Sequence, residues 1–113
     1  MRSEASDLDR LTEQIVRFRD DRDWKQFHNS KDLALALSIE AAELNELFLW
    51  KKPEEADKAR LAEELADVFV YGLLLAHENK FNVEKIILSK LRANAAKYPV
   101  EKSKGSAKKY SEL

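Results

Sequence analysis

Hydrophobic residues recur every three or four positions along most of this chain, which is the spacing of one face of an α-helix. Strand-like alternation is absent, and only two Gly and two Pro occur among the 113 residues. Two polar stretches, "DRDWKQFHNS" and "KKPEEADKAR", interrupt the helical periodicity. The pattern therefore predicts an all-α protein whose helices form an antiparallel, four-helix bundle-like core.

Residues that begin and end helices divide this pattern into four segments. Ser6, Asn29 or Ser30, and Asn82 are candidate N-caps, and Pro99 ends the last segment. The helices are predicted at about 7–22, 30–50, 59–79 and 83–97. We therefore expect a helical domain over residues 1–100. A polar tail, 101–113, is expected to be mobile or ordered only against a partner or ligand.

Composition narrows the classes of protein that the chain can belong to. Apolar residues make up 44% and charged residues 36%, which is typical of a globular protein. The net charge of −1 gives no electrostatic reason to expect nucleic-acid binding. Cysteine is absent, which excludes disulfides and thiolate chemistry. "MRSEASDLDRL" lacks an apolar signal core and no apolar run is long enough to span a membrane, so we expect a cytoplasmic protein without a membrane partner.

Two pairs of acidic residues lie inside apolar helical stripes. Glu40 and Glu43 occur in "SIEAAELNELFLW", and Glu64 and Asp67 occur in "RLAEELADVFVYGLLLA". Residues three apart lie on one side of a helix, so each pair points in one direction. The nearby basic residues lie close to helix ends and not in the centre of either stripe. They are Lys51, Lys52 and Arg60.

Four carboxylates converging from two helices would repel one another, and burying them without a partner would be costly. A hard divalent cation removes this conflict and prefers oxygen ligands. Neither motif contains His, which favours Mg²⁺ or Mn²⁺ over a mixed site for iron or zinc. The alternative is that the acids are ordinary solvated residues, because E-x-x-E is common in charged helices. Two copies within apolar stripes favour the metal site.

The order E-x-x-E followed by E-x-x-D resembles the signature of MazG-like nucleotide pyrophosphohydrolases, in the all-α NTP pyrophosphatase superfamily. "RDWKQFH", "LALALSIEAAELNELFLWK", "EELADVFVYGLLLA" and "LSKLRANAAKYPVEKSKGSAKKYSEL" look like its dCTP pyrophosphatase branch. The resemblance covers roughly residues 8–113. One departure is the linker between the acid motifs, which is shorter than in the family's eukaryotic members. Base preference is therefore not transferred from that branch.

This resemblance implies an enzyme that uses Mg²⁺, or alternatively Mn²⁺, to hydrolyse a dNTP to the dNMP and pyrophosphate. Its leading substrate would be dCTP or a modified dCTP, removed in house-cleaning of the nucleotide pool. The implied metal-binding and catalytic residues are Glu40, Glu43, Glu64 and Asp67. Assembly into a dimer or a dimer of dimers is also implied. The alternatives are hydrolysis of dUTP or phosphoribosyl-ATP, or a non-enzymatic dimerisation or adaptor protein whose acids are structural.

Further residues are expected to contact the nucleotide. Lys31 begins the second predicted helix, where a helix N-terminus favours phosphate, and Asn94, Lys97 and Tyr98 match the family's phosphate-side motif. Trp24, His28 and Trp50 are candidates for the base, and Tyr71 for the sugar. The alternative for these aromatic residues is a structural role in the core or in an interface, where Trp and Phe are common. Lys108, Lys109 and Tyr110 can fold over the phosphates or stay solvated.

Overall fold

The computed structural model describes residues 5–113, and this part of the chain contains helices and turns but no strands. Residues 1–4, which begin the predicted helical domain, lie outside the described residues. The α-helices are α1 (Asp7–Asp21), α2 (Ser30–Glu46), α3 (Lys58–Glu78), α4 (Val83–Lys97) and α5 (Val100–Ser103). Short 3₁₀ helices occur at Lys25–Phe27, Pro53–Glu55 and Tyr110–Glu112. The all-α prediction is confirmed. None of the described helices has the length and apolar character needed to cross a membrane.

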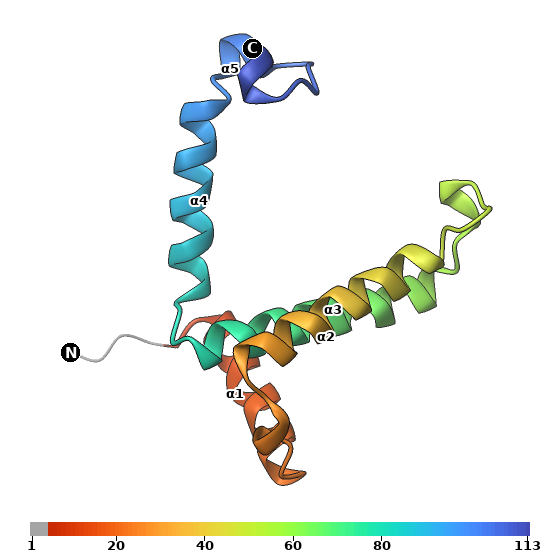
Figure 1. The fold of residues 1–113 in the computed structure, drawn as a ribbon, viewed down its shortest axis with the longest axis vertical. Coiled ribbons are helices and arrows are strands. Elements are labelled where there is room, and N and C mark those ends of the chain that lie inside the picture. The colour runs from red at the N-terminus through yellow and green to blue at the C-terminus, as the bar shows by residue number, and fades with distance from the viewer. Residues whose placement is uncertain (1–4) are drawn as a thin grey trace. The chain divides into compact units, whose positions relative to one another are not determined.

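The described chain forms two compact units. The first ends at Phe81 and contains α1, α2 and α3, and the second spans Asn82–Leu113. Within the first unit, α2 and α3 lie side by side and run in opposite directions, and α1 packs against α3 (Figure 1). The predicted boundary at residue 100 between a domain and a tail stays a prediction.

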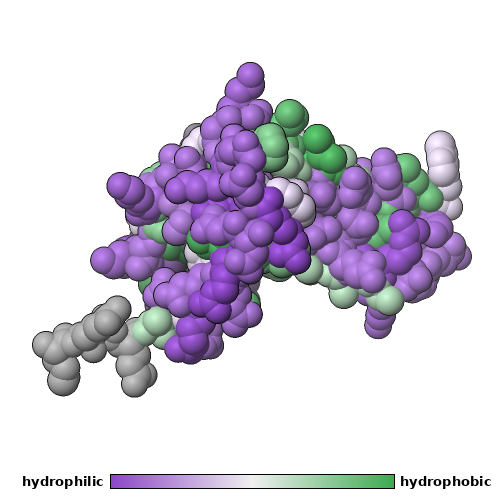
Figure 2. All heavy atoms as spheres, turned by 90° about the horizontal axis from the view of Figure 1, so that it is seen from below, coloured by the Kyte–Doolittle hydropathy of each residue, from purple (hydrophilic) through white to green (hydrophobic). Residues whose placement is uncertain are grey.

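The core of the first unit is small and aliphatic. Leu33 near the start of α2 is only 1% exposed, and it is accompanied by buried side chains of α3 and of the turn after α2. These are Leu47, Leu74 and Ala76. Other large apolar side chains reach the surface, where they lie between polar ones (Figure 2). The packing of α2 on α3 therefore supplies much of the buried apolar area.

Side-chain caps begin each of the four long helices. Ser6 and Asp9 form a capping box, in which each side chain accepts a hydrogen bond from the other's backbone N–H. The side chains of Asn29, Asp57 and Asn82 accept backbone N–H groups from the first turns of α2, α3 and α4. These bonds satisfy N–H groups that the helix itself leaves without partners. The predicted caps at Ser6 and Asn82 are confirmed, and Asn29 is the cap of α2.

The second helix ends four residues earlier than its predicted end at Trp50. After Glu46 the backbone bonds change to the tighter three-residue pattern, as in the Phe48 N–H donating to the Asn45 carbonyl. Trp50 then adopts a φ of 61°, which no α-helix contains. The apolar residues continue through this turn, so the sequence pattern did not reveal the change in backbone.

The second unit begins with α4, whose bounds match the predicted range 83–97. Pro99 follows the helix and precedes the single turn of α5. Gly105 then adopts a φ of 76°, in the left-handed region that glycine tolerates best. The polar segment beyond residue 100 thus contains a short helix, a glycine turn and a terminal 3₁₀ helix.

Candidate metal and nucleotide site

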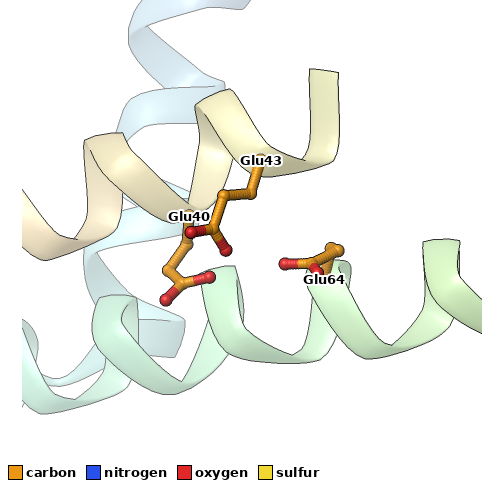
Figure 3. A group of neighbouring side chains, drawn as sticks. All are labelled: Glu40, Glu43 and Glu64. Carbon is orange, nitrogen blue, oxygen red and sulfur yellow. The ribbon is translucent and has the colours of Figure 1, made fainter. Parts of the chain in front are cut away.

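Three of the predicted carboxylates meet between α2 and α3. Glu40 and Glu43 project from α2 and Glu64 from α3, and each offers one oxygen within 4.8 Å of the others. Figure 3 shows the three side chains converging from the two helices. Glu40 and Glu64 are half-buried and Glu43 is exposed. The prediction that the two acid motifs face one another is therefore confirmed for these three residues.

This group of carboxylates carries an electrostatic conflict. The pKa of Glu40 is raised from 4.5 to about 7 by burial, by its hydrogen bond with Glu43 and by the charges of neighbouring acids. The pKa of Glu64 is also raised, chiefly by burial and by Glu43, although Arg60 opposes the rise. The ionised forms are therefore held in an environment that disfavours them.

The donor set fits a hard divalent cation. One oxygen of Glu40 and one of Glu64 are buried without a hydrogen-bond partner. Among residues 5–113 the ion pairs join Arg10 to Asp7 and Arg19 to Asp20, so neither involves the cluster. Mg²⁺ and Mn²⁺ prefer such oxygen ligands, and their charge would relieve the repulsion among the acids. Glu40, Glu43 and Glu64 are thus the residues that could hold the ion.

Asp67 lies outside the group of three but interacts with it. Its side chain is exposed, and its charge contributes to the raised pKa values of Glu40, Glu64 and Tyr71. Tyr71 is half-buried, and its pKa is raised by burial first and then by the charges of Glu40, Asp67 and Glu43. Tyr71 therefore presents a neutral hydroxyl beside the acidic group. The metal-ligand role of Asp67 and the sugar-contact role of Tyr71 stay predictions.

The predicted base-binding aromatics have different surroundings. Trp50 is fully exposed at 101% and is held by its left-handed backbone in the turn after α2. Trp24 packs edge to face against Phe18 at 5.8 Å between ring centroids, and Arg22 lies 3.6 Å above the Phe18 ring. The ring nitrogen Nδ1 of His28 is buried without a partner. Trp50 is thus the freest of these side chains to stack on a ligand.

The predicted phosphate-binding residues belong to both units. Lys31 lies in the first turn of α2 and is exposed. The neighbouring Ser30 accepts a hydrogen bond of 2.9 Å from the amide of Asn79, which ties the end of α3 to the start of α2. Asn94, Lys97 and Tyr98 lie at the end of α4, in the second unit. Their role in binding phosphate stays a prediction.

One charged residue of the first unit was missed by the sequence reasoning. Arg19 is only 3% exposed, its Nη1 has no partner, and its Nε donates a 2.9 Å hydrogen bond to the more exposed Asp20. A signal existed, because Arg19 follows Ile15 by four residues and so continues the apolar stripe of α1.

The all-α fold and its cluster of carboxylates define a class of helical proteins with an acidic site between two antiparallel helices. A family model described as MazG-like matches residues 35–113. The chain therefore belongs to the MazG-like family.

Curated relatives and a solved structure agree with this assignment. The chain is 41% identical over 104 residues to dCTP pyrophosphatase 1 of Bos taurus, covering 85% of this chain and 62% of the relative. It is 39% identical over 104 residues to dCTP pyrophosphatase 1 of Homo sapiens, covering 85% and 61%. The chain thus spans about three-fifths of the length of these relatives. A pyrophosphatase structure from Archaeoglobus fulgidus DSM 4304 matches with a TM-score of 0.79 and 33% identity, covering 88% of this chain and 98% of that one.

Proposed function

We propose that this protein is a Mg²⁺-dependent nucleoside triphosphate pyrophosphohydrolase, which converts a dNTP and water to the dNMP and pyrophosphate. The observation that carries the proposal is the meeting of Glu40, Glu43 and Glu64 within 4.8 Å, with two buried oxygens that lack partners. The raised pKa values of Glu40 and Glu64 mean that their ionised forms destabilise the fold. Binding of a cation therefore explains this acidic group better than a structural role does. Membership of the MazG-like family supports the same reaction.

The proposed metal ligands are Glu40, Glu43 and Glu64, joined by Asp67. When bound, Mg²⁺, or Mn²⁺ in its place, supplies positive charge to the phosphate oxygens of the substrate. The half-buried position of Glu40 and Glu64 limits the access of water to the ligand oxygens on that side. Tyr71 presents its neutral hydroxyl next to the acids, which suits a contact with the sugar.

Contacts with the rest of the nucleotide are assigned to residues with suitable chemistry. Lys31 and the N-terminus of α2 offer positive charge to a phosphate, and we propose that Asn94, Lys97 and Tyr98 do the same from α4. The exposed ring of Trp50 suits stacking on a base. His28, whose Nδ1 is buried without a partner, suits a hydrogen bond to a base edge, and Trp24 is the further candidate.

The leading substrate in this proposal is dCTP or a modified dCTP, and the physiological role is house-cleaning of the nucleotide pool. The support is the similarity to two proteins named dCTP pyrophosphatase 1, which are 41% and 39% identical to the chain. A side-by-side comparison of dCTP, 5-methyl-dCTP, dUTP, dATP and CTP tests the choice of base and sugar. Preference for dUTP or for a ribonucleotide would refute the assignment to dCTP while leaving the reaction type intact.

We further propose that the protein acts as a homo-oligomer, a dimer or a dimer of dimers. Large apolar side chains of the α2–α3 pair are exposed in helical i, i+4 pairs, and Phe69 is 62% exposed. The other members are Leu35, Ile39 and Leu65. Contact between copies would bury such side chains. Sedimentation of the wild type and of Phe69→Glu tests this, because a charge in the proposed contact should shift the protein toward monomer.

The reaction is tested by incubating the protein with each dNTP and Mg²⁺ and measuring pyrophosphate and orthophosphate separately. We expect pyrophosphate as the product, and we expect Glu43→Gln to abolish its release while circular dichroism shows the fold retained. Glu13→Gln is the matched control, because Glu13 is an exposed acid of α1 outside the cluster and should leave the rate unchanged. Absence of pyrophosphate with every nucleotide and divalent metal would reject the enzyme and favour a structural adaptor.

A further inference from the structure

The end of the chain folds back onto the last turn of α4. The ring of Tyr110 lies 6.1 Å from that of Tyr98 at an interplanar angle of 88°, which is an edge-to-face contact. The ammonium group of Lys97 lies over the same Tyr110 ring, 5.1 Å from its centroid. Lys97 is the last residue of α4 and Tyr98 its C-cap. One aromatic ring therefore engages two residues that are neighbours at the end of the helix.

The backbone between α5 and Tyr110 turns back toward the end of α4. The left-handed Gly105 reverses the chain direction after α5, and the Ser106 N–H donates to the Ser103 carbonyl at 3.0 Å. The Lys108 N–H then donates to the Ser106 hydroxyl at 3.2 Å. A 3₁₀ helix, Tyr110–Glu112, closes the segment. We call residues 104–113 the C-terminal strap.

We propose that Tyr110 is a positioning residue. By docking the C-terminal strap on the end of α4, it gathers Lys97, Lys108 and Lys109 into one clamp for the polyphosphate of the substrate or for the pyrophosphate product. This inference rests on the proposed function and extends it to residues outside the carboxylate cluster. Lys108 and Lys109 directly precede Tyr110, so docking of its ring brings both to the helix end that carries Lys97.

The charge of this segment agrees with an anionic ligand. Residues 97–113 contain five Lys and two Glu, and Lys97, Lys108 and Lys109 are all exposed. The C-terminal end of a helix already favours cations, because its last carbonyls carry partial negative charge. The ring of Tyr110 adds a second attraction for the ammonium of Lys97 through its π face. The docked strap therefore brings positive charge to the end of α4.

The docking contacts are weak, which makes the strap responsive to ligand. An exposed cation–π contact and an edge-to-face pair are each small interactions, and they must offset the loss of freedom of a ten-residue segment. These two contacts alone therefore hold the docked strap only weakly. A polyphosphate that binds three lysines only in the docked state would shift the population toward it.

The first test uses binding and not turnover. Hydrogen exchange of residues 104–113 is measured in the full chain with Mg²⁺ alone, with inorganic pyrophosphate and with inorganic orthophosphate. We expect pyrophosphate to slow exchange in the strap and orthophosphate at equal concentration to have little effect, because one phosphate cannot span three lysines. Equal exchange rates in all three conditions would overturn the proposal.

The second test uses Tyr110→Ala with Tyr110→Phe as its matched control, since Phe keeps the ring and loses only the hydroxyl. Tyr110→Ala should weaken pyrophosphate binding and raise KM for the nucleotide about tenfold, equivalent to about 1.4 kcal/mol. The kcat should change by less than about twofold, because uniform binding is lost and not transition-state binding. Tyr110→Phe should behave as wild type. Unchanged affinity in Tyr110→Ala, or equal losses in both variants, would refute the positioning role.

The two proposals fail in different ways. If no dNTP yields pyrophosphate, the proposed enzyme is wrong, and pyrophosphate affinity and strap exchange still decide whether Tyr110 forms a clamp. If dNTPs are hydrolysed but Tyr110→Ala leaves KM and pyrophosphate affinity unchanged, the strap alone is rejected. Lys108→Ala combined with Lys109→Ala should reproduce the effect of Tyr110→Ala without removing the ring.

Discussion

Replacing Glu40 by glutamine removes one charge from the carboxylate cluster and keeps the size of the side chain. In the metal-free protein the pKa of Glu40 is raised to about 7 by burial, by its hydrogen bond with Glu43 and by nearby acids. The folded state therefore holds a proton on Glu40 more tightly than the unfolded state does. The free energy of unfolding must then fall as pH rises from about 4.5 to about 7 and level off above that range.

The size of this effect follows from the same values. The difference between 4.5 and about 7 corresponds to at most about 3 kcal/mol. Glu40 is only half-buried, so water screens part of the interaction and we expect about 1–2 kcal/mol. Glu40→Gln should raise the metal-free stability by that amount above pH 7 and leave it nearly unchanged below pH 4.5. Saturating Mg²⁺ should stabilise the wild type above pH 7 and stabilise the variant much less.

The assay is urea unfolding followed by circular dichroism, with EDTA or with Mg²⁺, at pH values on both sides of this range. Glu13→Gln serves as the control, because it removes an exposed charge outside the cluster and should show the wild-type pH dependence. A metal-free Glu40→Gln protein that is less stable than wild type above pH 7 would refute the reasoning. So would a Mg²⁺ effect of equal size in the two proteins, since Glu40 would then not be a ligand.

Three further predictions concern stability and are measured by urea unfolding. Leu33→Ala should cost about 3 kcal/mol, because the side chain is 1% exposed. Leu11→Ala should cost less than about 1 kcal/mol, because Leu11 of α1 is 50% exposed and lies outside the proposed contact between copies. Similar losses in the two variants would contradict the assigned core. Ser6→Ala removes half of the capping box and should cost about 1 kcal/mol, and an unchanged midpoint would show that α1 is held by packing alone. Arg19→Met should leave the free energy of unfolding unchanged or raise it by about 1 kcal/mol, because the substitution removes a buried charge whose Nη1 has no partner. A loss above about 2 kcal/mol would mean that the guanidinium has a strong partner.

The sequence predicted helices well where a residue type marks both ends. The fourth helix is an example, because Asn82 caps its start and Pro99 follows its end. The end of α2 was not predictable in this way. Leu47 is buried and keeps the apolar pattern, although the backbone there has already left the α-helix. Side-chain periodicity reports which face is buried, and it is insensitive to a change in the backbone hydrogen bonds within one turn.

The candidate site was predictable to a similar degree. The spacing of three places Glu40 and Glu43 on one side of a helix, whatever the rest of the chain does. Their distance from Glu64 depends on the register between α2 and α3, which the packing of side chains far along both helices decides. The contact of Tyr110 with the end of α4 gave no signal in the spacing, because it depends on the reversal at Gly105.

The core and the acidic cluster share one helix pair, and this links the stability of the fold to occupancy of the site. Leu33 and Glu40 are about two turns apart on α2 and therefore lie on the same side of it, the side that packs on α3. Apolar packing holds the helices together while the ionised acids push them apart, and the fold tolerates the acids because the first effect exceeds the second. A bound cation would remove the repulsion without changing the packing. The register between α2 and α3 that packs the core is also the register that brings Glu64 close to Glu40 and Glu43. A substitution that disrupts the core packing should therefore also increase the distances between the carboxylate oxygens that would bind the ion.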